Sequence, residues 1–133
     1  MQEIVLETDR KLQLIEVTEQ IRAALGDTNG ATAALIYVPH TTAGVAINER
    51  IDPELVSDLE NAFQRVVGDD WEWTHSDEDG PNAPSHARAS LASSPQVLIP
   101  LKDGALALGT YQGVFFCEFD GPRTRKIYVT TLS

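Results

Sequence analysis

Residues 44–68 read GVAINERIDPELVSDLENAFQRVVG and predict a strand that is followed directly by an amphipathic helix. Asp52 is a good N-cap residue, and Pro53 suits the first position of a helix. Apolar residues then recur at helical spacing as far as Val67, and Gly68 can end the helix. The helix over 53–67 is therefore the clearest element of the chain.

The sequence on either side of this stretch predicts several strands and two shorter helices. A helix is expected between Thr18 and Gly26 and another from Pro84 to Ala92, with a long polar loop from Asp69 to Asn82. Strands are expected at Ile4–Leu6, Leu12–Leu14, Ala31–Pro39, Gly44–Asn48, Gln96–Leu101, Gly113–Phe119 and Lys126–Leu132. Strands and helices do not alternate regularly. We therefore expect an α+β fold, as a single compact domain over residues 1–133 with antiparallel or mixed sheets and two to three helices.

The composition argues against several classes of protein. The 133 residues are 42% hydrophobic and 23% charged, which is ordinary for a globular domain. They contain no run of the roughly 18 apolar residues that a transmembrane helix needs. The net charge of −10 disfavours nucleic acids and anionic membranes as partners. The acidic N-terminus does not resemble a signal peptide, and the lone Cys117 cannot form an intrachain disulfide, so a cytoplasmic protein is expected.

Three histidines are candidates for a metal site. His40, His75 and His86 fall in expected loops or at the ends of expected elements, where functional sites are usually built. Neutral imidazole is a favoured zinc ligand. Their spacing matches no metal-binding motif, and each also has a structural interpretation as a strand cap, a solvated loop residue or an exposed helix residue.

Two carboxylates also stand out. Glu49 follows an expected strand and is a candidate general base or metal ligand, whereas Asp52 is better explained as a helix cap. Glu118 interrupts an apolar strand, where a charge costs several kcal/mol unless it is paired. Glu118 therefore either faces solvent at a sheet edge or points inward and pairs with Arg123 or Arg125.

The C-terminal third holds a candidate anion site. The turn at 120–123 would present Arg123 and Arg125 on one face, because residues two apart in an extended segment share a face. Arginine suits phosphate or carboxylate, although salt bridges with an acidic surface explain the pair equally well. Glycines beside Thr110 and Gln112 allow close approach to a ligand or to another subunit.

Four motifs in this order resemble those of the YjbQ-like family of secondary thiamine-phosphate synthases, over essentially the whole chain. They are HTTAGVAINE at 40–49 followed by Asp52 and Pro53; His75 with Gly80, Asn82 and His86; Gly104 with LGTYQ at 108–112; and EFDGPRTR at 118–125. Tyr111 stands where the family usually has tryptophan, and Ser85 where alanine is commoner.

The resemblance implies a compact α+β fold, a homotrimer and an enzyme that joins a pyrimidine pyrophosphate to a thiazole phosphate. It implies a divalent metal on His40, His75 and His86, and histidine ligands favour zinc over magnesium. The remaining roles that we expect are catalytic for Asn48, Glu49 and Glu118 and substrate-binding for Thr110, Gln112, Arg123 and Arg125. Two alternatives stay open, namely a metal-dependent hydrolase of a small metabolite and a non-catalytic oligomeric protein that binds a small anion or metabolite.

Overall fold

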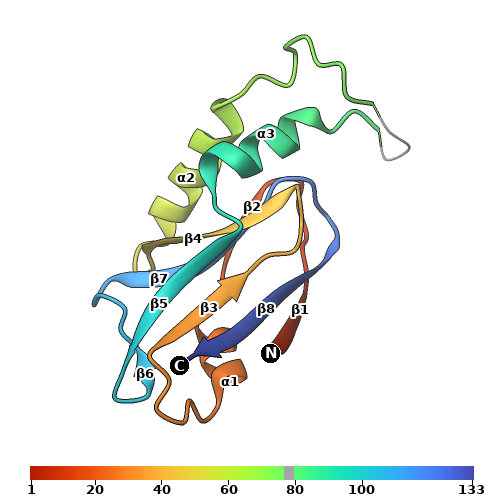
Figure 1. Cartoon of the computed structure of the whole chain (residues 1–133). Helices are drawn as coiled ribbons and strands as arrows, with labels where there is room; N and C mark the ends of the chain where they lie inside the picture. Colours follow the sequence, from red (N-terminus) through yellow and green to blue (C-terminus); the bar gives the residue numbers. More distant parts are fainter. Residues whose placement is uncertain (77–79) are drawn as a thin grey trace.

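Two antiparallel sheets and three helices make up the computed structural model, which describes residues 1–76 and 80–133 (Figure 1). The helices are α1 (Thr18–Leu25), α2 (Pro53–Arg65) and α3 (Ala83–Ala92). The strands are β1 (Gln2–Glu7), β2 (Gln13–Glu16), β3 (Ala33–Tyr37), β4 (Ala43–Glu49), β5 (Gln96–Lys102), β6 (Ala105–Leu106), β7 (Gln112–Glu118) and β8 (Thr124–Leu132). No helix among the described residues is long and apolar enough to cross a membrane.

The strands are divided between a five-stranded and a three-stranded sheet. Their orders are β1-β8-β3-β5-β6 and β2-β7-β4, and every pairing between neighbouring strands is antiparallel. This confirms the α+β prediction and resolves its choice between antiparallel and mixed sheets.

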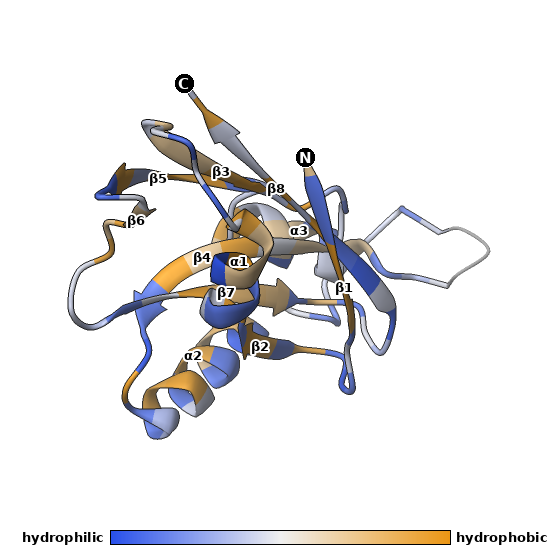
Figure 2. Ribbon diagram, turned by 90° about the horizontal axis from the view of Figure 1, so that it is seen from below, coloured by the Kyte–Doolittle hydropathy of each residue, from blue (hydrophilic) through white to orange (hydrophobic). Residues whose placement is uncertain are grey.

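Strand β7 lies between two layers of the fold, with one face toward the five-stranded sheet and the other toward the helices. Its side chains alternate, so that Val114 and Phe116 face the core between the two sheets while Phe115 and Cys117 face the helices α2 and α3. Both faces of β7 are therefore buried, and burial raises the pKa of the Cys117 thiol to about 12. In Figure 2, α2 lies below the three-stranded sheet and α1 lies between the two sheets.

The predicted central helix is present but ends earlier than expected. Asp52 Oδ1 accepts a hydrogen bond from the backbone N–H of Glu54 at 2.9 Å, which confirms it as the N-cap. The helix ends at Arg65 rather than at Val67. The buried Arg88 of α3 donates to the carbonyl oxygens of Gln64 and Val67 at 2.9 and 3.0 Å. Carbonyl groups at the C-terminal end of a helix have no N–H partner within the helix, so α3 supplies the donors there.

Pairing partners that are distant in the sequence account for two further differences. Strand β8 begins at Thr124 instead of Lys126, because its first residues pair with β1 in the register Glu7↔Thr124. The two-residue strand β6 was not predicted and exists only as the partner of β5. The described part of the expected loop at 69–82 contains no helix or extended strand, and residues 77–79 lie outside the described residues.

Gly44 lets α3 lie against the three-stranded sheet. Val45 and Ser94 exchange two backbone hydrogen bonds of 2.8 and 3.0 Å, which tie the segment after α3 to β4. A Cβ atom on Gly44 would lie 2.8 Å from the carbonyl oxygen of Ser94 and closer still to the hydroxyl of Ser93. The position therefore requires glycine, and through this contact it sets where α3 carries His86.

Candidate functional site

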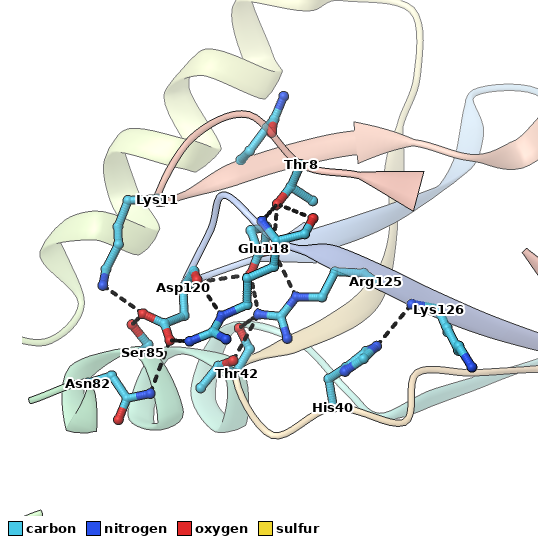
Figure 3. Close-up of polar contacts among 12 residues, drawn as sticks. Thr8, Lys11, His40, Thr42, Asn82, Ser85, Glu118, Asp120, Arg125 and Lys126 are labelled. Atoms are coloured by element: carbon cyan, nitrogen blue, oxygen red, sulfur yellow. Dashed lines mark hydrogen bonds and ion pairs between the residues drawn. The ribbon is translucent and has the colours of Figure 1, made fainter. Parts of the chain in front are cut away.

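A buried ion pair lies where β7 ends and β8 begins (Figure 3). Arg125 donates from Nε to Glu118 Oε1 at 2.8 Å and from Nη2 to Glu118 Oε2. Arg125 Nη2 also donates to the hydroxyl of Thr42 at 2.8 Å. Glu118 is 0% exposed and Arg125 4%, so Glu118 points inward and Arg125 is its partner.

Both oxygens of the Glu118 carboxylate accept hydrogen bonds from within the protein. Its oxygens also accept hydrogen bonds from the Thr8 hydroxyl at 2.8 Å and from the backbone N–H of Asp120 at 3.0 Å. Burial alone would raise the pKa of Glu118, but the hydrogen bonds from Arg125, Asp120 and Thr8 outweigh burial and lower it. Glu118 is therefore ionised at neutral pH, and its hydrogen bonds with Arg125 hold that side chain in place.

Asp120 forms a second buried carboxylate beside the first. It accepts from Lys11 Nζ at 2.6 Å, from Arg123 Nη2 at 2.7 Å and from Asn82 Nδ2 at 3.0 Å. Burial opposes ionisation, yet the hydrogen bonds, led by that from Asn82, hold the pKa of Asp120 well below its usual range. The carboxylate thus joins the turn after β7 to the N-terminus of α3.

A pocket of about 300 Å³ opens beside these two carboxylates. His40, Thr41 and His86 line it from the β3–β4 connection and from α3. We call it the polar pocket, because its other lining residues are mostly polar or charged, namely Pro39, Thr42, Asn82, Arg123 and Arg125. Arg123 and Arg125 therefore do face one site, as the turn at 120–123 predicts.

A second pocket, of about 350 Å³, shares His40, Thr41 and His86 with the first. We call it the apolar pocket, because three of its four other lining residues are apolar: Ala43, Ala89 and Pro95, with Ser90 as the fourth.

His40 has a defined hydrogen-bonding role. Its Nε2 accepts the backbone N–H of Lys126 at 2.9 Å, so in the neutral ring the proton is assigned to Nδ1. Burial lowers the pKa of His40, and the charge of Arg125 lowers it further. At neutral pH the ring is therefore uncharged, with Nδ1–H as its remaining polar group.

The three histidines come near one another without forming a ready metal site. The rings of His75 and His86 meet edge to face with centroids 5.1 Å apart, and these two residues line a small pocket together with Ala83. His40 shares its two pockets with His86. In residues 1–76 and 80–133, however, no three histidine, cysteine or carboxylate side chains are arranged to hold a metal ion. The Nε2 lone pair of His40 is already used and Nδ1 is protonated, so the donor set does not fit a three-histidine site as it stands.

Comparison with known proteins shows to which family the chain belongs. The family model described as UPF0047 protein YjbQ-like matches residues 2–133. The chain belongs to the YjbQ-like family. It is 40% identical to UPF0047 protein MJ1081 of Methanocaldococcus jannaschii over 125 residues, which cover 93% of this chain and 88% of that protein. It is also 40% identical to UPF0047 protein YugU of Bacillus subtilis, over 93% of this chain and 92% of YugU.

Solved structures agree with this YjbQ-like fold. The hypothetical protein APE1520 from Aeropyrum pernix K1 superposes with a TM-score of 0.88 at 34% identity, over 99% of this chain and 97% of that one. An uncharacterized YjbQ/UPF0047 protein from Clostridium acetobutylicum superposes with a TM-score of 0.87 at 35% identity, over 99% of this chain and all of that one.

Four of the predicted site residues of this YjbQ-like chain lie away from the pockets. Asn48 and Glu49 end β4, whereas His40 precedes the start of that strand. Gln112 pairs with Glu49 in the ladder, and Thr110 lies two residues before the start of β7. Six residue steps of about 3.3 Å along β4 put this end roughly 20 Å from the ion pair, so one chain does not bring the two groups together.

Several residues of the site were missing from the sequence-based set. Thr8, Thr42 and Asp120 complete the buried network, and Asn82 lines the polar pocket with a buried Oδ1 that accepts no hydrogen bond from the described residues. The signal was the density of charge at 118–125, where two acids and two arginines alternate with turn residues. The contribution of Thr8, 110 residues from Glu118, has no local signal.

Proposed function

We propose that this YjbQ-like protein is an enzyme that acts on a small phosphorylated molecule and binds its phosphate group in the polar pocket. Arg125 is the observation that carries the proposal. Its Nε and Nη2 are committed to Glu118 and Thr42, and no hydrogen bond between described residues uses its Nη1. An arginine held rigidly with a free nitrogen at a pocket is suited to a phosphate oxygen.

His40 supports the same assignment from the other side of the pocket. Its neutral ring can donate from Nδ1, because Nε2 is occupied by Lys126. The hydroxyl of Thr41 is a further possible donor on the pocket wall. Donors rather than acceptors are what an oxyanion requires.

The reaction that we propose resembles thiamine-phosphate synthesis, in which a pyrimidine pyrophosphate and a thiazole phosphate are joined and pyrophosphate leaves. Negative charge gathers on the departing pyrophosphate. Donors already fixed at that position, here Arg125 and His40, lower the barrier because they need not reorganise. Glu118 acts through Arg125 as a positioning residue, because its own oxygens are fully used inside the protein.

Binding and turnover of defined compounds test this proposal. We expect inorganic phosphate to bind in titration calorimetry, and His40→Ala to weaken it about tenfold or more, the usual loss for a hydrogen bond to a charged group. Thr110→Ala at an exposed position outside both pockets is the control. Thiamine phosphate formed from the two precursors would support the transferase. Release of phosphate without the thiazole would indicate the hydrolase, and binding without turnover would indicate the non-catalytic protein.

A divalent metal, zinc before magnesium, stays a prediction within this proposal. His75 and His86 already touch, but His40 must turn its ring or give up Lys126 before it can join them. Elemental analysis of the purified protein tests the prediction, and His86→Ala should then remove most of the metal. Full metal content in that variant would contradict the three-histidine site.

We also propose a homotrimer, which an uncovered apolar face supports. Val5 and Leu98 are each 59% exposed on the outer side of the five-stranded sheet, and the rings of Tyr37 and Tyr128 stack beside them with centroids 6.5 Å apart. The helices in Figure 2 lie on the other side of this sheet. Light scattering coupled to gel filtration should give three times 14.5 kDa, and Leu98→Glu should reduce that mass.

A further inference from the structure

The two pockets adjoin, and their lining changes character at their common wall. His40, Thr41 and His86 belong to both. The lining of the polar pocket includes Arg123 and Arg125. The lining of the apolar pocket, apart from the shared residues, is mostly Ala43, Ala89 and Pro95. A ligand that fills both spaces must therefore change character at the two imidazoles.

We infer that the ligand has two parts: a phosphate group in the polar pocket, joined directly to a compact apolar or aromatic group in the apolar pocket. The inference rests on the proposed function, because it takes phosphate as the anionic part. It adds where the attached group is held, in the apolar pocket, and places the bond between the parts beside His40 and His86.

The apolar pocket excludes other kinds of attached group. Among the described residues, no aspartate, glutamate, lysine or arginine lines it, so a charged or heavily hydroxylated group would lose its water without gaining partners. An apolar group loses nothing on leaving water and gains contact with Ala89 and Pro95. The volume of about 350 Å³ accommodates a single ring with ease, whereas a long chain would have to extend out of it.

Ser90 is the position that limits the size of this group. It lies on α3 within the lining, and it is exposed, so a larger side chain there would reach into the pocket without displacing core residues. Ala89 lines the same pocket but is only 9% exposed and belongs to the core beneath α3, which makes it a poorer site for substitution.

Calorimetric titrations with methyl phosphate and phenyl phosphate test the inference on the unmodified protein. The two probes share the ester phosphate and differ in the attached group. We expect phenyl phosphate to bind at least tenfold more tightly. Equal affinities would overturn the inference while leaving the phosphate site intact, whereas failure of both probes and of inorganic phosphate to bind would overturn the proposed function itself.

A pair of variants then locates the preference. Ser90→Phe should remove the preference for phenyl phosphate and change the affinity for methyl phosphate less than twofold. Leu91→Phe is the matched control, since Leu91 is 67% exposed on the same helix and does not line the pocket. A preference that survives Ser90→Phe, or that Leu91→Phe abolishes equally, would show that the apolar pocket does not hold the attached group.

Discussion

The ladder between β4 and β7 has two ends that treat polar residues in opposite ways. At one end Ala43 pairs with Glu118, which is fully buried in a network that includes Thr8 directly after β1, Arg125 of β8 and, through Asp120, Ser85 of α3. At the other end Glu49 pairs with Gln112, whose Oε1 accepts a hydrogen bond from the nearby Gly109 N–H at 2.8 Å. Long-range partners fix the first end, and local turns satisfy the second. The difference separates the residues that build the polar pocket from residues such as Glu49 and Gln112, which were predicted as site residues but lie away from it.

The largest effect should come from removing the buried carboxylate. Glu118→Ala leaves Arg125 charged, 4% exposed and without its partner, which typically costs about 3–5 kcal/mol of unfolding free energy. Urea unfolding followed by circular dichroism measures the loss. Glu49→Ala is the control at the other end and should change stability by no more than about 0.5 kcal/mol. A Glu118→Ala protein that kept its stability would contradict the role of Glu118 as the buried partner of Arg125.

The second carboxylate of the network should give a pH-dependent effect. Asp120→Asn weakens hydrogen bonds to a charged group and should cost about 1.5–3 kcal/mol at pH 7. The pKa of Asp120 is depressed in the folded state, so its stabilisation is complete above the unfolded carboxyl pKa near ~4 and is lost as pH falls further. The gap between wild type and variant should therefore close in acid.

Unfolding curves at pH 7 and at successively lower pH test this expectation. The exposed Asp58 of α2 provides the matched substitution, and Asp58→Asn should track the wild type at every pH. A constant gap between wild type and Asp120→Asn down to the lowest pH would mean that the Asp120 carboxylate does not contribute through its charge.

The contact of α3 with β4 comes next in size. Gly44→Ala forces a Cβ atom against Ser94, and overpacking of this kind costs about 1–3 kcal/mol. Because the same contact places His86, phosphate affinity should fall as well. Gly109→Ala at the other end meets only the flexible Gln112 side chain at 3.3 Å and should be tolerated. The unfolding free energy and the phosphate affinity of both variants test this expectation. Equal losses in the two variants would contradict the special role of Gly44.

The contrast also shows how far the sequence could lead. The helix at 53–65 was predictable because its cap and its apolar spacing are local, and so was the inward Glu118, although only as one of two alternatives. Which arginine would pair with Glu118, and that Thr8 and Thr42 would join them, depends on β1, β4, β7 and β8 meeting in register. Local patterns carry no such information. The family resemblance also grouped Asn48, Glu49, Thr110 and Gln112 with the histidines, since the order of motifs does not reveal the 20 Å or so between the strand ends.

The smallest effect should come from the end that lies away from the pockets. Gln112→Ala removes one hydrogen bond at an exposed position, and Asn48→Ala removes an acceptor for its neighbour's N–H at 2.8 Å. Each should change the unfolding free energy by about 0.5 kcal/mol or less and phosphate affinity less than twofold. Paired titrations with His40→Ala give the scale. A loss in Gln112→Ala as large as in His40→Ala would show that this end reaches the pocket after all. Because one chain separates the two by roughly 20 Å, a second copy of the protein would then have to supply the residue.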